Sequence, residues 1–309
     1  MTILDLLKEG REFYAGLDLD KDLDVEILLA FTLGVEKEYL LSHGEENVEA
    51  GDRDVFLKYL EQRANGEPIA YITHTKEFYG LDFYVDERVL VPRPETELIV
   101  DEVLDFLTGE EMTEELVKRA GVAEGVSEVR LPVATMLDVG TGSLNITTAV
   151  LKNFDNVCAD AVDVSEDALE VARMNREYHD LETWVEVYYS DLLSNVDGRE
   201  FDVIVSNLPY IGAGKFDTAT DDVKKSEPHS ALYGKNASAG SSGLDLYKKL
   251  IQQIVEKNVD FNLLVCEFGF GQVDGVKQLL NKFFDQGFQW EIKDDLAGIP
   301  RIFVVKKIK

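Results

Sequence analysis

A glycine-rich turn is the first segment whose residue types and spacing could do chemistry. An apolar run leads into this turn and a helical pattern follows it; the turn consists of Gly140, Thr141, Gly142, Ser143 and Leu144. Such a turn lets the backbone approach a ligand closely, and in doubly wound sheets ligands bind beyond the carboxyl ends of the strands. The five residues are therefore expected to hold a nucleotide-like cofactor.

Two acidic residues lie at the ends of the next two apolar runs. Asp163 follows Gly140 by about 20 residues, the spacing at which a carboxylate binds ribose hydroxyls in nucleotide-binding folds. Asp191 could accept a hydrogen bond from an adenine amino group, and the side chain of Leu192 could cover the adenine ring. The sequence thus predicts a pocket for a nucleoside.

The glycine pattern favours a sulfonium cofactor over a dinucleotide. A pyrophosphate-binding loop usually contains a third glycine, and this turn lacks it. Asp138, just before the glycines, suits a ligand with a positively charged amino acid end better than one with two phosphates. We therefore expect the cofactor to be S-adenosylmethionine.

A polar turn at the end of the fourth expected strand indicates the reaction. This turn reads Asn207, Leu208, Pro209 and Tyr210. A planar amide or amino nitrogen attacks poorly unless its N–H groups are held and its lone pair is aimed at the methyl carbon. The Asn207 side-chain oxygen and the Leu208 carbonyl could accept those two N–H bonds while Tyr210 stacks on the flat target. Asn207 is also expected to border the cofactor, and the turn predicts methyl transfer to such a nitrogen.

The elements that must position these residues alternate between strand and helix. Strands are expected at 135–139, 158–164, 184–190, 201–207, 262–268, 289–293 and 301–306. Alternation of this kind predicts an α/β fold with a doubly wound, mostly parallel sheet. Residues 1–74 show helical spacing, and 75–90, rich in aromatic and β-branched residues, predict a hairpin linker. A Glu-rich stretch at 109–128 is interpreted as a surface insertion.

Composition narrows the classes of partner. The chain has 31 Lys and Arg against 60 Asp and Glu, a net charge of −29, which repels polyphosphate and argues against a nucleic-acid substrate. No run approaches the roughly 18 apolar residues of a membrane span, and the charged N-terminal sequence is unlike a signal peptide, so a cytoplasmic protein is expected. Four scattered histidines and two isolated cysteines predict no metal site.

The sequence resembles the release-factor glutamine methyltransferases over nearly its whole length. The resemblance is carried, beside the two turns, by segments 66–72, 76–80, 91–97, 227–232, 267–272 and 295–301. It implies a Rossmann-like S-adenosylmethionine-dependent methyltransferase domain at 91–309, with an antiparallel last strand, after a helical substrate-recognition domain. It further implies N5-methylation of the glutamine in the Gly-Gly-Gln motif of class 1 peptide chain release factors, by a monomer.

Two residues depart from the family pattern. The family usually has Gly at the position of Leu144, whose side chain could crowd the methionine end of the cofactor or face the core harmlessly. The family usually has Asn-Pro-Pro-Tyr where residues 207–210 of this chain read Asn-Leu-Pro-Tyr, so Leu208 replaces the first proline. A leucine still offers the backbone carbonyl, and activity is therefore expected to survive.

Three alternatives remain open at this stage. The same turn could methylate a glutamine of a ribosomal protein. It could also serve a nucleic-acid amino-methyltransferase, since an exocyclic amine poses the same lone-pair problem, although the acidic charge argues against that class. Finally, Leu144 could have closed the cofactor site, leaving a binding protein without catalysis.

Overall fold

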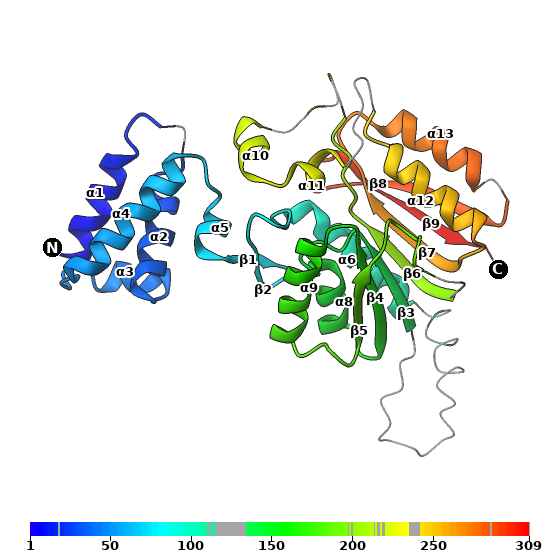
Figure 1. The fold of residues 1–309 in the computed structure, drawn as a ribbon, viewed down its shortest axis with the longest axis horizontal. Coiled ribbons are helices and arrows are strands. Elements are labelled where there is room, and N and C mark those ends of the chain that lie inside the picture. Colours follow the sequence, from blue (N-terminus) through cyan, green and yellow to red (C-terminus); the bar gives the residue numbers. More distant parts are fainter. Residues whose placement is uncertain are drawn as a thin grey trace, which may run out of the picture. The chain divides into compact units, whose positions relative to one another are not determined.

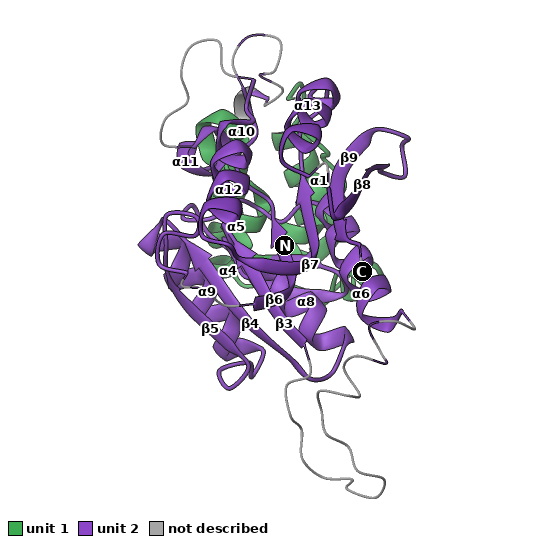
Figure 2. Ribbon diagram, turned by 90° about the vertical axis from the view of Figure 1, so that its right-hand side faces the viewer, with its two compact units in different colours: residues 1–75, 221–226 green, residues 76–220, 227–309 purple. Residues whose placement is uncertain are grey.

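The computed structural model describes the chain except for residues 18, 110, 111, 113, 115–133, 197, 199, 213, 215, 216, 218, 219, 235–241, 285 and 309. It divides into two compact units, shown in different colours in Figure 2. One comprises Met1–Thr75 and Asp221–Ser226, and the other comprises Lys76–Thr220 and Glu227–Lys309. Most of the expected surface insertion at 109–128 lies outside the described residues.

The smaller unit is helical, as the sequence predicts. Its helices are α1 (Ile3–Phe13), α2 (Leu23–Leu33), α3 (Lys37–Ser42), α4 (Ala50–Ala64), α5 (Ile69–Thr73) and α10 (Asp221–Ser226). A capping box starts α1: Asp5 N donates to Thr2 Oγ1 over 3.2 Å, and Thr2 N donates to Asp5 Oδ2 over 2.9 Å. Apolar side chains from α1, α2 and α4 form the core of this unit, among them Leu6, Leu28 and Phe56.

The expected hairpin follows this helical unit in the chain. It consists of β1 (Thr75–Phe78) and β2 (Leu81–Tyr84), which form a two-stranded sheet. Both turn residues, Tyr79 and Gly80, have positive φ angles, 55° and 73°, which the tight turns of hairpins commonly require.

A seven-stranded sheet forms the centre of the larger unit, with the order β5-β4-β3-β6-β7-β9-β8. β9 runs antiparallel to both of its neighbours, and all other pairings are parallel. The strands are β3 (Ala134–Val139), β4 (Val157–Asp163), β5 (Val185–Tyr189), β6 (Glu200–Ser206), β7 (Asp260–Glu267), β8 (Phe288–Asp294) and β9 (Pro300–Lys307). The predicted doubly wound sheet with an antiparallel last strand is confirmed.

Helices cover both faces of this sheet (Figure 1). Figure 1 shows α12 and α13 on one side, and α6, α8 and α9 on the other. The bounds of the helices in this unit are η1 (Pro94–Thr96), α6 (Glu97–Thr108), α8 (Asn145–Asn153), α9 (Glu166–Tyr178), α11 (His229–Tyr233), α12 (Asp245–Glu256) and α13 (Val273–Phe283). Within the described part of the chain, no helix is long and apolar enough to cross a membrane.

The register of the central strands brings the functional turns together. Val139 pairs with Val162 of β4 and with Ser206 of β6. The residues that follow these strands therefore meet at one edge of the sheet, at the point where the strand order reverses from β3. This edge is where ligands bind in open α/β sheets.

Candidate functional site

The glycine turn after β3 passes directly against the polar turn after β6. Gly140 has a φ of 77°, and its N–H donates to the Val162 carbonyl over 2.8 Å. A Cβ on Gly140 would lie only 2.8 Å from Cδ2 of Leu208. Gly140 is thus required both by its backbone conformation and by the close approach of the two turns. Gly142 also has a positive φ, 53°, but has open space around it.

Asp138 has the properties expected of a residue that faces a cation. Its fully buried carboxylate accepts hydrogen bonds on Oδ2 from the Thr141 and Thr147 hydroxyls, both over 2.8 Å. Oδ1 is buried and has no hydrogen-bond partner. Burial raises the pKa of Asp138 to about 6, although the two hydroxyls act in the opposite direction. A buried carboxylate with an unsatisfied oxygen fits the ammonium end of S-adenosylmethionine.

Asp163 ends β4 and supports the glycine turn. Its Oδ2 accepts from the Gly142 N–H over 3.1 Å, and its Oδ1 accepts from Ser165 N over 2.9 Å. Ser165 in turn caps α9. The carboxylate is half-buried and lies at the turn where the ribose hydroxyls were expected to bind.

The two residues expected at adenine follow β5. The Asp191 carboxylate pairs with Lys249 Nζ over 2.7 Å, and both side chains are about half exposed. Leu192 is buried and has a φ of 53°. The ion pair with Lys249 was not predicted, and it leaves Asp191 with further lone pairs for an amino group.

Two acceptors fix the carboxamide of Asn207. Its Nδ2 donates to Thr96 Oγ1 over 3.0 Å and to Glu267 Oε2 over 3.1 Å. Within the described residues, Asn207 Oδ1 receives no hydrogen bond. The side chain therefore presents an acceptor on the side opposite to Thr96 and Glu267, as the prediction for a bound N–H group requires.

The backbone of Leu208 is hydrogen-bonded to a buried tyrosine, Tyr247. Leu208 N donates to the Tyr247 hydroxyl over 2.9 Å, and that hydroxyl donates to the Glu267 carbonyl. The Leu208 side chain is buried, and it packs in the core between sheet and helices. Leucine at this position therefore fills space while its backbone stays anchored.

Tyr210 is tied to the loop after β7, and Pro209 precedes it. The Tyr210 hydroxyl donates to Glu267 Oε1 over 2.8 Å, and its carbonyl accepts from Gln272 Nε2 over 2.7 Å. Burial, followed by the Glu267 charge, raises the pKa of Tyr210 well above its usual value. There is no room for a side chain at Gly243, where a Cβ would lie 1.9 Å from the Tyr210 oxygen. The turn after β6 is thus held on several sides.

Leu144 starts α8 in the left-handed conformation, with a φ of 68°. Its side chain has no exposed surface. This burial is compatible with the core-facing interpretation of the departure from glycine.

Three polar residues that sequence reasoning gave no role take part in this arrangement. Thr96 and Glu267 hold Asn207, and the fully buried Asn175 donates to the carbonyls of Ser143 and Tyr84, both over 2.9 Å. Thr96 and Glu267 lie in segments that carry the family resemblance, and this was the only signal for them. Among the described residues, no three His, Cys, Asp or Glu side chains gather as metal ligands would.

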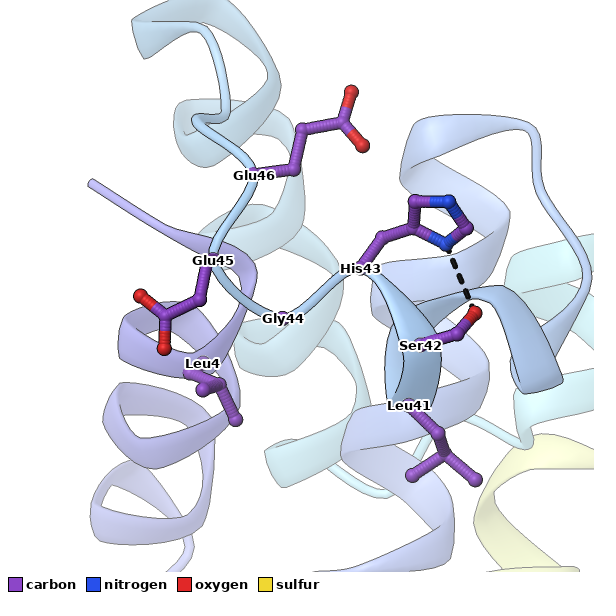
Figure 3. A pocket seen from close by; sticks show the side chains of 7 residues that line it. All are labelled: Leu4, Leu41, Ser42, His43, Gly44, Glu45 and Glu46. Carbon is purple, nitrogen blue, oxygen red and sulfur yellow. Dashed lines mark hydrogen bonds between the residues drawn. The ribbon is translucent and has the colours of Figure 1, made fainter.

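The helical unit carries a separate open pocket of about 430 Å³, shown in Figure 3. Its lining is formed by Leu4, Leu41, Ser42, His43, Gly44, Glu45 and Glu46. The Ser42 hydroxyl and His43 Nδ1 lie 2.9 Å apart, and the His43 ring stacks on Tyr39 at 3.7 Å. These polar groups interact with one another, and the pocket contains none of the residues predicted to do chemistry.

Comparisons with known proteins find matches to both parts of the chain. Residues 5–73 match the model of the PrmC N-terminal domain, and residues 126–229 match that of the Methyltransferase small domain. The chain is 37% identical to the release factor glutamine methyltransferase of Koribacter versatilis, covering 92% of this chain and 91% of that protein. It is 32% identical to the enzyme of the same name from Rhodopirellula baltica, covering 99% of this chain and 96% of that protein.

Solved structures show the same fold. The hMettl16 catalytic domain, solved in complex with MAT2A 3′UTR hairpin 6, aligns over 78% of this chain and 81% of that chain. The TM-score is 0.53 and the identity 14%, which establishes the fold alone. Given the identities over nearly full-length relatives and the two matched domains, the chain belongs to the release factor glutamine methyltransferase family.

Proposed function

We propose that this methyltransferase transfers a methyl group from S-adenosylmethionine to the side-chain amide nitrogen, N5, of the glutamine in the Gly-Gly-Gln motif of class 1 peptide chain release factors. The names of its relatives support the substrate class. One structural observation carries the chemistry: Asn207 Nδ2 is bound on one side, so that Oδ1 is left to accept an N–H from the other.

The proposed cofactor site lies at the carboxyl ends of β3, β4 and β5. The turn residues 140–144 would hold the methionine end, and the unsatisfied oxygen of Asp138 would accept from its ammonium group. Asp163 binds the ribose hydroxyls, and Asp191 and Leu192 bind adenine. When bound, the cofactor supplies a methyl group made electrophilic by a positively charged sulfur.

The protein's contribution is to align the target amide and to hold its protons. The glutamine NH₂ group donates one N–H to Asn207 Oδ1 and the other to the Leu208 carbonyl, and Tyr210 packs against the flat amide. The held nitrogen would gain one bond to the methyl carbon as the bond from that carbon to sulfur breaks and its electron pair stays on sulfur, and the nitrogen would release one of its two protons to water. No strong base is needed, because the methylated nitrogen is cationic and acidic, so alignment and electrostatics account for catalysis.

The helical residues 1–74 are proposed to help hold the release factor, and residues 75–90 to link them to the catalytic domain at 91–309. Their match to the PrmC N-terminal domain, at residues 5–73, supports a role specific to this family rather than to methyltransferases in general.

Mass spectrometry of a purified class 1 release factor tests this function. After incubation with the protein and S-adenosylmethionine, the peptide that contains Gly-Gly-Gln should gain one methyl group, and fragmentation should place it on the glutamine side chain. A release factor with asparagine in place of that glutamine is the matched control and should gain none. An unmodified release factor, or faster methylation of ribosomal proteins or nucleic acid in parallel reactions, would overturn the proposal.

A further inference from the structure

The orientation of the Asn207 carboxamide decides whether the site works. A carboxamide has two orientations of nearly equal shape, related by a half-turn that exchanges its oxygen and nitrogen. One orientation offers an acceptor to the target amide, and the other points an NH₂ group at the target's own NH₂ group. A binding site for an amide therefore needs something behind Asn207 that tolerates only one of the two.

Glu267 provides such a partner because it ends β7 beside Asn207, the first residue after β6. Ser206 of β6 pairs with Cys266 of β7, so the residue after each lies at the same level. The Glu267 side chain is 1% exposed, and its carboxylate accepts three hydrogen bonds. They come from the Thr96 hydroxyl at 2.6 Å, the Asn207 amide at 3.1 Å and the Tyr210 hydroxyl at 2.8 Å.

An ionised carboxylate only accepts hydrogen bonds, and this property propagates to its neighbours. The Thr96 hydroxyl donates its single proton to Glu267 Oε2. Its oxygen can therefore only accept from Asn207 Nδ2, which lies 3.0 Å away. Both groups behind Asn207 are thus acceptors, and both require the NH₂ group to face them. A flipped Asn207 would place its oxygen against two acceptors.

The groups around Glu267 act on its ionisation in opposite directions. The pKa of the Glu267 carboxyl is raised, chiefly by burial, whereas the hydrogen bonds from Thr96 and Tyr210 and the charge of Arg301 lower it and so favour the ionised form that only accepts. A buried carboxylate is costly and adds little to stability compared with an apolar side chain of similar size. Its presence here is explained by orientation rather than by folding.

We propose that Glu267, acting with Thr96, is a positioning residue that holds the Asn207 carboxamide with Oδ1 toward the target amide. This inference rests on the proposed function and adds to it the residue that selects the productive orientation. Glu267 touches neither the target nor the cofactor in this arrangement, so it acts through Asn207 and, by accepting from the Tyr210 hydroxyl, also through Tyr210.

Exchanging the two functional groups tests the inference. Asn207→Asp places two carboxylates 3 Å apart, whereas Asn207→Asp with Glu267→Gln restores one donor and one acceptor in swapped positions. In the double variant the inner oxygen of residue 207 accepts from the new amide, and its outer oxygen can still accept from the target. The measurements are kcat and KM for the release factor, cofactor affinity by calorimetry, and the melting temperature.

The double variant is expected to turn over at least about tenfold faster than Asn207→Asp, a coupling of about 1.4 kcal/mol, within the range for contacting residues. Glu267→Gln alone should lower kcat while leaving cofactor affinity and melting temperature nearly unchanged. Thr96→Val should also lower kcat, and Thr96→Ser, which keeps the hydroxyl, should restore most of the loss.

Independent, additive effects of the two substitutions on kcat, in variants that fold and bind the cofactor, would overturn the positioning role. The positioning role would also be overturned if Glu267→Gln lowered the melting temperature and kcat in proportion, because loss of stability would then explain the loss of activity. If the wild-type protein itself methylates no release factor, the proposed function fails. Coupling in the melting temperatures, which needs no substrate, would then still report whether the Asn207–Glu267 contact exists.

Discussion

Replacing Leu144 by Gly and by Ala separates backbone strain from packing at the one position where the glycine turn departs from its family. The residue has a φ of 68°, and its side chain is fully buried. A side chain in the left-handed conformation costs roughly 1–2 kcal/mol, which glycine avoids. Truncating a buried leucine to alanine costs about 2.7–5 kcal/mol. The lost packing therefore outweighs the relieved strain.

Both variants should be less stable than the wild type, but in an unusual order. Leu144→Ala should lose about 3 kcal/mol or more, because alanine keeps the strain and loses the packing. Leu144→Gly should lose about 1 kcal/mol less free energy of unfolding than Leu144→Ala. At positions with a negative φ the order is reversed, because a glycine variant there is less stable than an alanine variant by roughly 0.5–1 kcal/mol. Denaturant unfolding of the three proteins measures the order directly.

The same two variants decide whether Leu144 obstructs the cofactor. Because the side chain faces the interior, calorimetric titration should give the same affinity for S-adenosylmethionine in Leu144→Gly as in the wild type. Tightening by about tenfold, or 1.4 kcal/mol, would show that the leucine crowds the cofactor. Lower stability of the glycine variant than of the alanine variant would refute the strain argument.

Three further predictions concern the turns and the buried acid. Gly140→Ala should lower both stability and activity more than Gly271→Ala, because both have a φ of 77° but only the first has a neighbour within reach of a Cβ. Asp138→Asn should gain stability relative to the wild type as the pH rises from about 4 to 7, by up to about 3 kcal/mol, since burial raises the pKa of that carboxyl from 3.8 to about 6. Asn207→Ala should lower kcat far more than cofactor affinity, whereas Asp163→Ala should weaken cofactor binding first.

Each of these has a contrary outcome. Equal losses in the two glycine variants would mean that strain alone, and not the close approach of the turns, matters at Gly140. The sign of the pH effect follows because Asp138 is protonated in both the folded and the unfolded wild type well below pH 3.8. Between about pH 4 and 6 only the unfolded state ionises, which lowers the stability of the wild type. If the difference in stability between Asp138→Asn and the wild type did not change with pH, burial of the Asp138 charge would carry no free-energy cost. Equal losses of kcat and affinity in Asn207→Ala would remove it from the target side.

The sheet could be predicted because each of its strands is a short apolar run that can be recognised from the local sequence. The expected strands at 135–139 and 201–207 became β3 and β6, and the turns after them met as the topology of a doubly wound sheet requires. The mostly parallel pairing was predicted from the alternation of strands and helices, and the antiparallel β9 from the family resemblance; both are confirmed.

The polar contacts behind the site could not be predicted in the same way. Asn207 meets Thr96 from 111 residues away and Glu267 from 60 residues away, through a strand register that no local pattern reveals. The partner of Asp191, Lys249, lies 58 residues distant on α12. Local periodicity fixes elements and their facing sides, whereas such contacts depend on how separate elements align in three dimensions.

The most direct test of the account is a crystal structure of the protein with S-adenosylhomocysteine and a Gly-Gly-Gln peptide. We expect the glutamine nitrogen to lie within hydrogen-bond distance, roughly 2.7–3.2 Å, of both Asn207 Oδ1 and the Leu208 carbonyl, and to face the cofactor sulfur. A complex in which the Asn207 oxygen turns toward Thr96, or in which the glutamine binds elsewhere, would contradict it.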